Sequence, residues 1–212
     1  NAEGIDATND LSFLCIQASM HTQLPAPSFS VRIWNGTPNE FLIKCAELTR
    51  TGVGLPAYYN DEVIIPALMS RGVTLADARE YGIIGCVEPQ KPFKTDGWHD
   101  AAFFNMCRPL ELVFSNGVDK GAQISIKTGN VEDMTTFEEF YSAYKAQETY
   151  MIGLMVNAIN AIDTAHSERV PLPFLSCMVE DCVKEGKTVQ EGGAHYNFTG
   201  PQGFGIANMA DG

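Results

Sequence analysis

The sequence predicts an α/β fold in which short strands alternate with longer helices and pair in parallel. First, apolar residues recur at helical spacing along much of the 212-residue chain. Second, the apolar stretches without that spacing are short, such as residues 28–34, which alternate as a strand does. Third, 45% of the residues are hydrophobic and 19% are charged, which is typical of a globular domain with a buried core.

The first half of the chain contains four expected helices and two expected strands. They are a helix over 11–20, a strand over 28–34, a helix through Phe41 and Leu48, a helix from Asn60, a short helix over 74–79 and a buried strand at 83–84. Thr37 and Pro38 suit the start of the second helix, because proline fits the first helical position. Glycine and proline break the chain at 52–56, and a loop follows the second strand as far as Trp98.

The second half is expected to be mainly helical. The pattern predicts helices over 99–114, 137–166 and 175–184, with a proline break at 171–173. Residues 192–205 are rich in glycine and are expected to form a loop or a strand.

The charge of the chain excludes some classes of partner. The formal net charge is −12 and no basic cluster stands out, which argues against a nucleic-acid partner, since nucleic acid is held mainly by lysine and arginine. No run of 18 apolar residues occurs, so no membrane span is expected.

The cysteines indicate neither a metal site nor a disulfide framework. No two of them have C-x-x-C spacing, and the histidines lack the spacing of a metal site. Free cysteine behaves as a small hydrophobe in a core, and this usage favours a reducing cytoplasm. The six cysteines are Cys15, Cys45, Cys86, Cys107, Cys177 and Cys182.

The two ends of the sequence do not resemble natural termini. The chain begins with Asn1 rather than Met and stops just after a glycine-rich stretch. We therefore expect residues 1–212 to be an internal fragment of one catalytic domain.

A thiol and a carboxylate lie two residues apart in residues 85–90 (GCVEPQ). The residue before a proline is pushed into extended geometry, so Glu88 is expected to be extended. In an extended segment, residues two apart point to the same side, which would direct Cys86 and Glu88 into one pocket with Cα atoms roughly 6–7 Å apart. Judged by spacing alone, a buried structural cysteine beside a solvated glutamate is an equal alternative.

Four segments together resemble the glycyl radical enzymes, a family similar to pyruvate formate-lyase. They are residues 85–89 (GCVEP), 199–203 (TGPQG), 54–61 (GLPAYYND) and 97–100 (GWHD). The resemblance covers nearly the whole chain and is closest to the eliminating branch. It implies a ten-stranded α/β barrel with the cysteine loop at its centre.

The resemblance also implies a mechanism. A glycyl radical would convert Cys86 to a thiyl radical, which abstracts hydrogen from a substrate carbon. Glu88 would be the base that takes the proton of the adjacent hydroxyl. The resulting radical then expels a leaving group from the neighbouring carbon of a small-molecule substrate.

The same resemblance places the radical glycine outside this chain. The family carries it in a C-terminal loop of the form R-V-x-G-[YF], which does not occur in residues 1–212. The fragment alone is therefore expected to bind no cofactor and to be inactive. The whole protein is expected to need a radical S-adenosylmethionine activating enzyme, to form a homodimer and to associate with a bacterial microcompartment.

Residues near the cysteine reduce the range of expected substrates. Pyruvate formate-lyase has two adjacent cysteines at this loop, and the neighbour here is Gly85, which disfavours formate acetyltransferase activity. Asp100 stands where the glycerol and propanediol dehydratases carry an aspartate that holds a substrate hydroxyl. A carboxylate stabilised at a helix N-terminus is an alternative for Asp100. His99 and Phe103 stand near positions where, by the resemblance, choline lyases carry threonine and tyrosine, and that alignment disfavours choline.

The expected reaction is thus loss of water from glycerol or a 1,2-diol, with Asp100 and His99 as candidate substrate-binding residues. His99 could instead be only a partly buried surface histidine. Carbon–nitrogen or carbon–sulfur cleavage, as in choline trimethylamine-lyase or isethionate sulfite-lyase, stays open as an alternative. Two other classes are a cysteine hydrolase, with Cys86 activated by His99 or His195, and an inactive relative.

Overall fold

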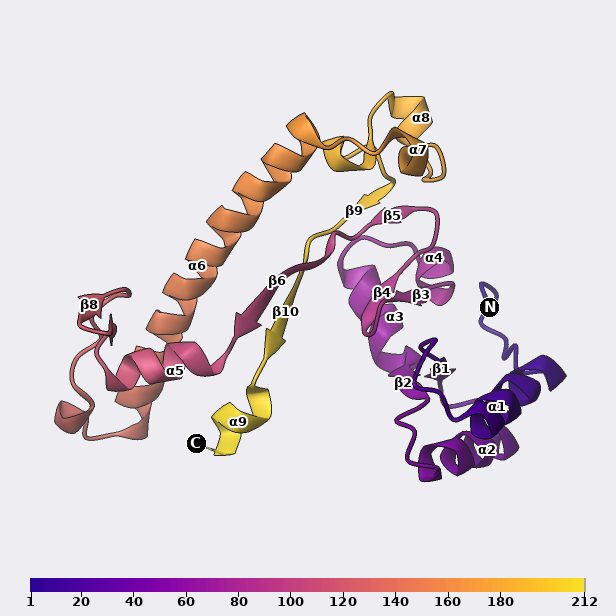
Figure 1. The fold of residues 1–212 in the computed structure, drawn as a ribbon, viewed down its shortest axis with the longest axis horizontal. Coiled ribbons are helices and arrows are strands. Elements are labelled where there is room, and N and C mark those ends of the chain that lie inside the picture. Colours follow the sequence, from indigo (N-terminus) through magenta and orange to yellow (C-terminus); the bar gives the residue numbers. More distant parts are fainter. Residues whose placement is uncertain (212) are drawn as a thin grey trace. The chain divides into compact units, whose positions relative to one another are not determined.

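The computed structural model describes residues 1–211 of the chain. It divides into two compact units, Asn1–Thr95 and Asp96–Gly212 (Figure 1). Each unit has its own helices and strands.

The first unit contains a parallel strand pair and an antiparallel hairpin. Strands β1 and β2 run parallel with α2 between them in the chain, from Ser30 opposite Ala57 to Ile33 opposite Asn60. This is the helical crossover that a parallel pair requires. The elements are α1 (Asp10–Thr22), β1 (Ser30–Ile33), α2 (Asn39–Arg50), β2 (Ala57–Asn60), α3 (Asp61–Ser70), α4 (Leu75–Arg79), β3 (Gly82–Ile84) and β4 (Glu88–Gln90); β5 (Thr95–Asp96) spans the division between the units.

One helix face builds the core of this unit. Phe41, Cys45 and Leu48 of α2 are all buried, and their spacing places them on one side of the helix. They pack with Ile16 of α1 and Val31 of β1 in a single apolar cluster. The helical spacing through Phe41 and Leu48 therefore predicted the core face correctly.

A network of polar side chains fixes the base of the β3–β4 hairpin. The guanidinium of Arg32 donates to both carboxylate oxygens of Asp61, at 2.9 and 2.7 Å, and to the carbonyl oxygen of Tyr81 at 3.0 Å. The Tyr81 hydroxyl donates to Asp61 at 2.7 Å, and its ring lies 3.9 Å from the guanidinium carbon. Burial and the neighbouring Asp61 raise the pKa of Tyr81 well above its usual range, so the phenol stays protonated as a donor. Since Tyr81 directly precedes β3, the network ties the hairpin to β1 and α3.

The second unit is organised around one long helix and one parallel strand pair. Strands β6 and β10 run side by side, and α6 contains 33 residues (Figure 1). The elements are β6 (His99–Asn105), α5 (Cys107–Phe114), β7 (Val118–Asp119), β8 (Ala122–Gln123), α6 (Phe137–Arg169), α7 (Pro173–Ser176), α8 (Cys182–Glu185), β9 (Tyr196–Asn197), β10 (Gly200–Phe204) and α9 (Ile206–Asp211), with short 3₁₀ turns at Val131–Asp133 and Val189–Glu191.

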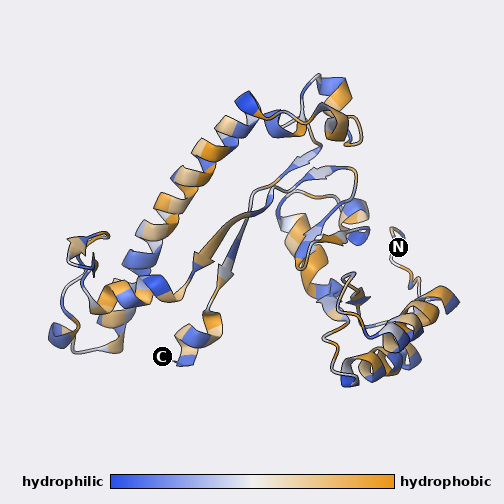
Figure 2. Cartoon of the chain, viewed as in Figure 1, coloured by the Kyte–Doolittle hydropathy of each residue, from blue (hydrophilic) through white to orange (hydrophobic). Residues whose placement is uncertain are grey.

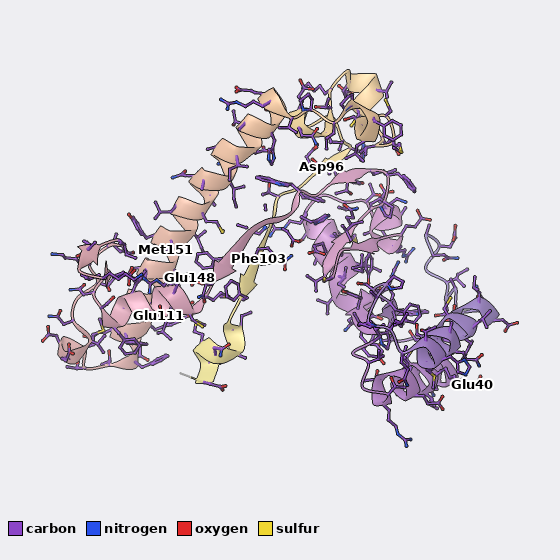
Figure 3. The ribbon with its side chains drawn as sticks, viewed as in Figure 1. Glu40, Asp96, Phe103, Glu111, Glu148 and Met151 are labelled. Carbon is purple, nitrogen blue, oxygen red and sulfur yellow. The ribbon has the colours of Figure 1, made fainter. Side chains whose placement is uncertain are left out.

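Local sequence signals explain where α6 begins and what it packs against. Thr136 and Glu139 form a capping box that satisfies free amide groups at its start. Ala143 and Tyr144 on its first turns pack with Val113 of α5 in a buried cluster. Apolar and polar residues alternate along the rest of the helix (Figure 2), and Glu148 and Met151 project from its middle (Figure 3). The expected helix over 137–166 is therefore confirmed and ends slightly later, at Arg169.

Two expected helices are wrong in part. Residues 99–105 form strand β6 rather than the first half of a helix, because they pair with β10, and α5 begins only at Cys107. The expected helix over 175–184 is replaced by two short helices, α7 and α8. Asp181 has a φ of 73°, a left-handed conformation that no helix interior contains.

None of the helices in residues 1–211 is long and apolar enough to cross a membrane.

Candidate functional site

Cys86 lies at the tip of the β3–β4 hairpin. Ile84 pairs with Glu88, so residues 85–87 form the turn between the strands. The side chain of Cys86 is exposed and forms no disulfide. Glu88, the first residue of β4, is only 9% exposed. The hairpin thus presents a thiol outward and buries the carboxylate behind it.

The Glu88 carboxylate folds back onto the turn. Its Oε2 accepts hydrogen bonds from the backbone N–H of Cys86 at 3.0 Å and of Val87 at 2.9 Å. Two N–H donors stabilise the negatively charged form of a carboxylate. The prediction that Glu88 is extended is confirmed. The extended geometry expected for Cys86 is wrong, because Cys86 belongs to the turn that the carboxylate closes.

Gly85 makes this arrangement possible. Its φ of 57° lies in the left-handed region that side chains disfavour. A Cβ atom at this position would lie 2.9 Å from Glu88 Oε2, closer than such contacts occur. The turn therefore favours glycine here, because the left-handed φ strains any side chain and the Glu88 carboxylate would have to shift to admit one.

Tyr59 holds the other side of Cys86 and was missed from the sequence. Its hydroxyl donates a hydrogen bond to the carbonyl oxygen of Cys86, across 27 residues of chain. Tyr59 belongs to β2 and is 8% exposed. It lies in the motif at 54–61, but nothing in the motif's spacing indicated which side chain reaches the cysteine.

His99 and Asp100 begin strand β6, where its pairing with β10 is irregular. His99 pairs with Gly200, but Pro201 pairs with Ala102, so Asp100 and the next residue bulge out of the ladder. Asp100 is exposed and has a φ of 58°, which marks local strain. The alternative of a carboxylate at a helix N-terminus is wrong, because the helix starts seven residues later, at Cys107.

Gln202 of β10 reaches the same bulge. Its side-chain amide donates a hydrogen bond to Asp100 Oδ1, across 102 residues of chain. His99 is half-buried, with its ring folded against Gly97: a Cβ atom there would lie 2.3 Å from the imidazole. Phe103 of β6 is 64% exposed (Figure 3). Gln202 is the second residue missed, although it lies within the motif at 199–203.

The structure therefore forms two partial constellations. Cys86 and Glu88 lie together in the first unit with Tyr59, whereas His99 and Asp100 lie together in the second unit with Gln202. A radical hydrogen abstraction next to a hydroxyl group needs an exposed sulfur and a nearby base, and the first constellation contains both. That the two constellations face one substrate stays a prediction.

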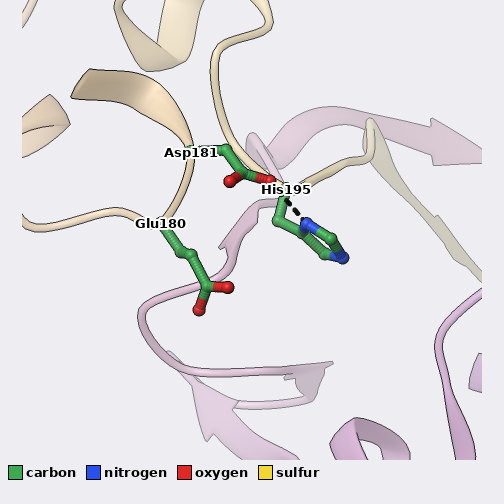
Figure 4. A group of neighbouring side chains, drawn as sticks. All are labelled: Glu180, Asp181 and His195. Atoms are coloured by element: carbon green, nitrogen blue, oxygen red, sulfur yellow. Dashed lines mark hydrogen bonds and ion pairs between the residues drawn. The ribbon is translucent and has the colours of Figure 1, made fainter. Parts of the chain in front are cut away.

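A third cluster lies outside the predicted site (Figure 4). Glu180, Asp181 and His195 bring three possible metal-ligating atoms within 4.8 Å of one another. His195 Nδ1 lies 2.6 Å from Asp181 Oδ2, and Lys184 Nζ lies 3.6 Å from Oδ1. The hydrogen bond from His195 is the main cause of the lowered pKa of Asp181. Because Asp181 already has His195 and Lys184 as partners, the cluster is accounted for by these local contacts.

A cavity of about 730 Å³ in the first unit is not the predicted site. Trp34, Arg79 and the N-terminal segment line it, but Cys86 and Glu88 do not. The thiol stands on the exposed turn instead. Cavity size therefore does not identify the chemistry of this chain.

Comparison with known proteins identifies relatives over the whole chain. Residues 1–212 match the family model described as pyruvate formate lyase-like. A solved structure described as 1,2-propanediol dehydration in Roseburia inulinivorans is 67% identical with a TM-score of 0.94, over 100% of this chain and 26% of its own. The glycerol-bound B12-independent glycerol dehydratase from Clostridium butyricum is 63% identical with a TM-score of 0.94, over 100% and 27%.

A curated relative extends the same pattern. The (2S)-3-sulfopropanediol dehydratase of Klebsiella oxytoca is 40% identical over 211 residues, which are 99% of this chain and 26% of the relative. The chain thus spans about a quarter of the length of the proteins that it matches.

Proposed function

The chain belongs to the pyruvate formate lyase-like family, and on that premise we propose that the full-length protein is a glycyl radical dehydratase. It removes water from glycerol or a 1,2-diol. The observation that carries the proposal is the β3–β4 turn, where an exposed thiol stands beside a buried carboxylate. The high identity to a propanediol-dehydrating and a glycerol-dehydrating protein supports the same substrate class.

The resemblance inferred from the four motifs is confirmed, and so is the fold. The solved relatives include a further glycyl radical enzyme, from Archaeoglobus fulgidus, at a TM-score of 0.91. Residues 1–212 are therefore one part of the larger α/β barrel of these enzymes.

The proposed reaction begins and ends at Cys86. A glycyl radical in the rest of the protein, installed by a radical S-adenosylmethionine activating enzyme, would supply the oxidising equivalent. The Cys86 sulfur then takes a hydrogen atom from a hydroxyl-bearing carbon, so that an S–H bond forms as a C–H bond breaks. Glu88 accepts the proton of that hydroxyl. The neighbouring hydroxyl takes that proton from Glu88 and leaves as water, and the product radical recovers the hydrogen atom from the Cys86 thiol, which becomes the thiyl radical again.

The substrate side of the proposal rests on Asp100 and His99. Asp100 would accept a hydrogen bond from a substrate hydroxyl while Gln202 orients its carboxylate. His99, half-buried against Gly97, would line the same place. A bulge with a left-handed residue is a usual means of re-aiming a side chain next to a site.

Formate acetyltransferase activity does not fit the turn. A second cysteine at position 85 would place its Cβ atom 2.9 Å from Glu88 Oε2. An acyl-carrying thiol at position 85 would therefore require the Glu88 carboxylate to shift from its place on the turn. The elimination reaction is the one that keeps the carboxylate.

A substrate panel tests the function. The full-length protein, activated anaerobically with its activating enzyme, should convert propane-1,2-diol or glycerol to the aldehyde. We expect kcat/KM for one of them to exceed that for choline and isethionate by at least about 100-fold, since their leaving groups need different pocket contacts. Aldehyde, trimethylamine and sulfite are measured in parallel. Trimethylamine or sulfite as the main product would refute the dehydratase assignment, and turnover in air without activation would favour the cysteine hydrolase.

Replacing Gly85 by alanine tests the turn. The new methyl group would push the Glu88 carboxylate away from the Cys86 amide, and we expect kcat to fall by about 10- to 100-fold, because small misplacements of reacting groups are costly. Gly52→Ala is the matched control, since Gly52 also has a left-handed φ, of 79°, but a Cβ atom there meets nothing within 4 Å. An unchanged kcat in Gly85→Ala, measured at equal glycyl radical content, would contradict this account of the turn.

A further inference from the structure

The backbone on both sides of Cys86 is held by side chains rather than by the strand ladder. On the amide side, Glu88 Oε2 accepts from the N–H groups of Cys86 and Val87. On the carbonyl side, the Tyr59 hydroxyl donates to the oxygen of Cys86. Residues 85–87 form the turn, outside the paired residues of β3 and β4, so these contacts determine where the thiol stands.

Tyr59 is itself fixed in place. It belongs to the β1–β2 pair, where it stands opposite Arg32 in the register. Two residues further along the chain, Asp61 binds the Arg32 guanidinium in a bidentate pair and accepts from the Tyr81 hydroxyl. Because Tyr81 directly precedes β3, the strand that carries Tyr59 and the hairpin that carries Cys86 are joined at their bases.

The chemistry of Tyr59 suits a permanent donor. Burial is the main cause of its raised pKa; a hydrogen bond with Ser30 lowers the pKa, and the neighbouring Glu88 and Cys86 raise it. The phenol therefore stays protonated and can keep donating to the carbonyl oxygen of Cys86.

We propose that Tyr59 is a positioning residue that holds the Cys86 peptide through its hydroxyl and thereby sets the position of the sulfur for hydrogen-atom transfer. The inference rests on the proposed function, because it assigns Tyr59 a part in the same reaction. Tyr59 acts through the backbone of Cys86. Its effect is therefore on the rate of the hydrogen-transfer step, and substrate affinity depends on other groups.

Tyr59→Phe in the activated full-length protein tests this, because it removes one oxygen atom and keeps the ring. We expect kcat to fall by about tenfold while KM changes by less than about twofold, since a misplaced reacting group slows chemistry without removing substrate contacts. The deuterium isotope effect on kcat with substrate labelled at the abstracted position should increase, because hydrogen transfer becomes slower relative to the other steps. Glycyl radical content, measured by electron paramagnetic resonance, should be unchanged.

Tyr58→Phe is the matched control on the same strand. The Tyr58 hydroxyl lies 2.7 Å from Thr49 Oγ1, on an exposed face away from the turn. We expect this variant to keep the kcat, KM and isotope effect of the unmodified protein. A Tyr59→Phe variant that does the same would overturn the proposal. So would a loss of kcat that follows entirely from lower radical content or a lower melting temperature.

Hydrogen–deuterium exchange separates failure of this inference from failure of the proposed function. In Tyr59→Phe, and not in Tyr58→Phe, the peptide that contains residues 85–88 should exchange about tenfold faster, because the turn has lost its hold on the Cys86 carbonyl. This measurement needs no substrate. If the unmodified protein fails to dehydrate diols, the proposed function is wrong. Faster exchange in Tyr59→Phe would still support the role of Tyr59 in holding the Cys86 peptide, and unchanged exchange would overturn it.

Discussion

Replacing Cys86 by serine in the full-length protein should abolish turnover while the glycyl radical persists. The substitution keeps the shape of the side chain and the backbone contacts of the turn to Glu88 and Tyr59. However, the O–H bond of serine is stronger than the S–H bond of cysteine, so the radical is not passed on to residue 86. We expect product formation to fall by at least about 1,000-fold, since the covalent chemistry of the site depends on this one atom.

The measurement pairs product formation with the amplitude of the radical signal in the same sample. Cys177→Ser is a suitable control, because Cys177 is also exposed and free but lies far along the chain from the turn. It should retain both the radical and the activity. If Cys86→Ser kept its turnover, or if it lost activity only because no radical formed, the role of Cys86 as hydrogen abstractor would be wrong.

Glu88→Gln should lower kcat by about 10²- to 10⁴-fold, the range for loss of a general base. The amide oxygen of glutamine can still accept from the Cys86 and Val87 amides, as Glu88 Oε2 does. The turn is thus preserved while the group that takes the hydroxyl proton is removed.

Glu88→Ala separates the two roles of this side chain. It removes the base and also leaves the two turn amides without their acceptor, so its melting temperature should fall below that of Glu88→Gln. Equal stability of the two variants would show that the backbone bonds contribute little. A Glu88→Gln variant with near-normal kcat would exclude Glu88 as the base.

Much of the fold follows from patterns within single segments. The spacing of Phe41, Cys45 and Leu48 predicted both the helix and its buried face. The helix α6 could also be predicted from the sequence, because its apolar spacing continues over many turns. In contrast, residues 99–105 form a strand because β10, about one hundred residues later, pairs with them. Pairing between such distant segments leaves no local trace in the sequence.

Some residues of the candidate site could likewise be predicted from the sequence, and others could not. Cys86 and Glu88 could be selected because they stand close together in a recognisable motif. In the structure, the Glu88 carboxylate accepts hydrogen bonds from the turn that contains Cys86. This arrangement depends on the left-handed conformation of Gly85, which is not expected when residues 85–88 are interpreted as one extended segment. Tyr59 and Gln202 lie within the motifs at 54–61 and 199–203, but their hydrogen bonds join residues that are 27 and 102 positions apart in the chain. Such contacts become visible only in three dimensions.

The close approach of position 85 to Glu88 Oε2 has an evolutionary consequence. A one-step mutation from glycine to cysteine at this turn would damage the existing base before it could offer a second thiol. The reverse order, loss of the carboxylate first, would pass through an enzyme without its proton acceptor. We therefore expect positions 85 and 88 to be coupled, so that the effect of a substitution at one depends on the residue at the other. A change from eliminating to acyl-transferring chemistry at this turn is therefore expected to be easier when both positions change than when either changes alone.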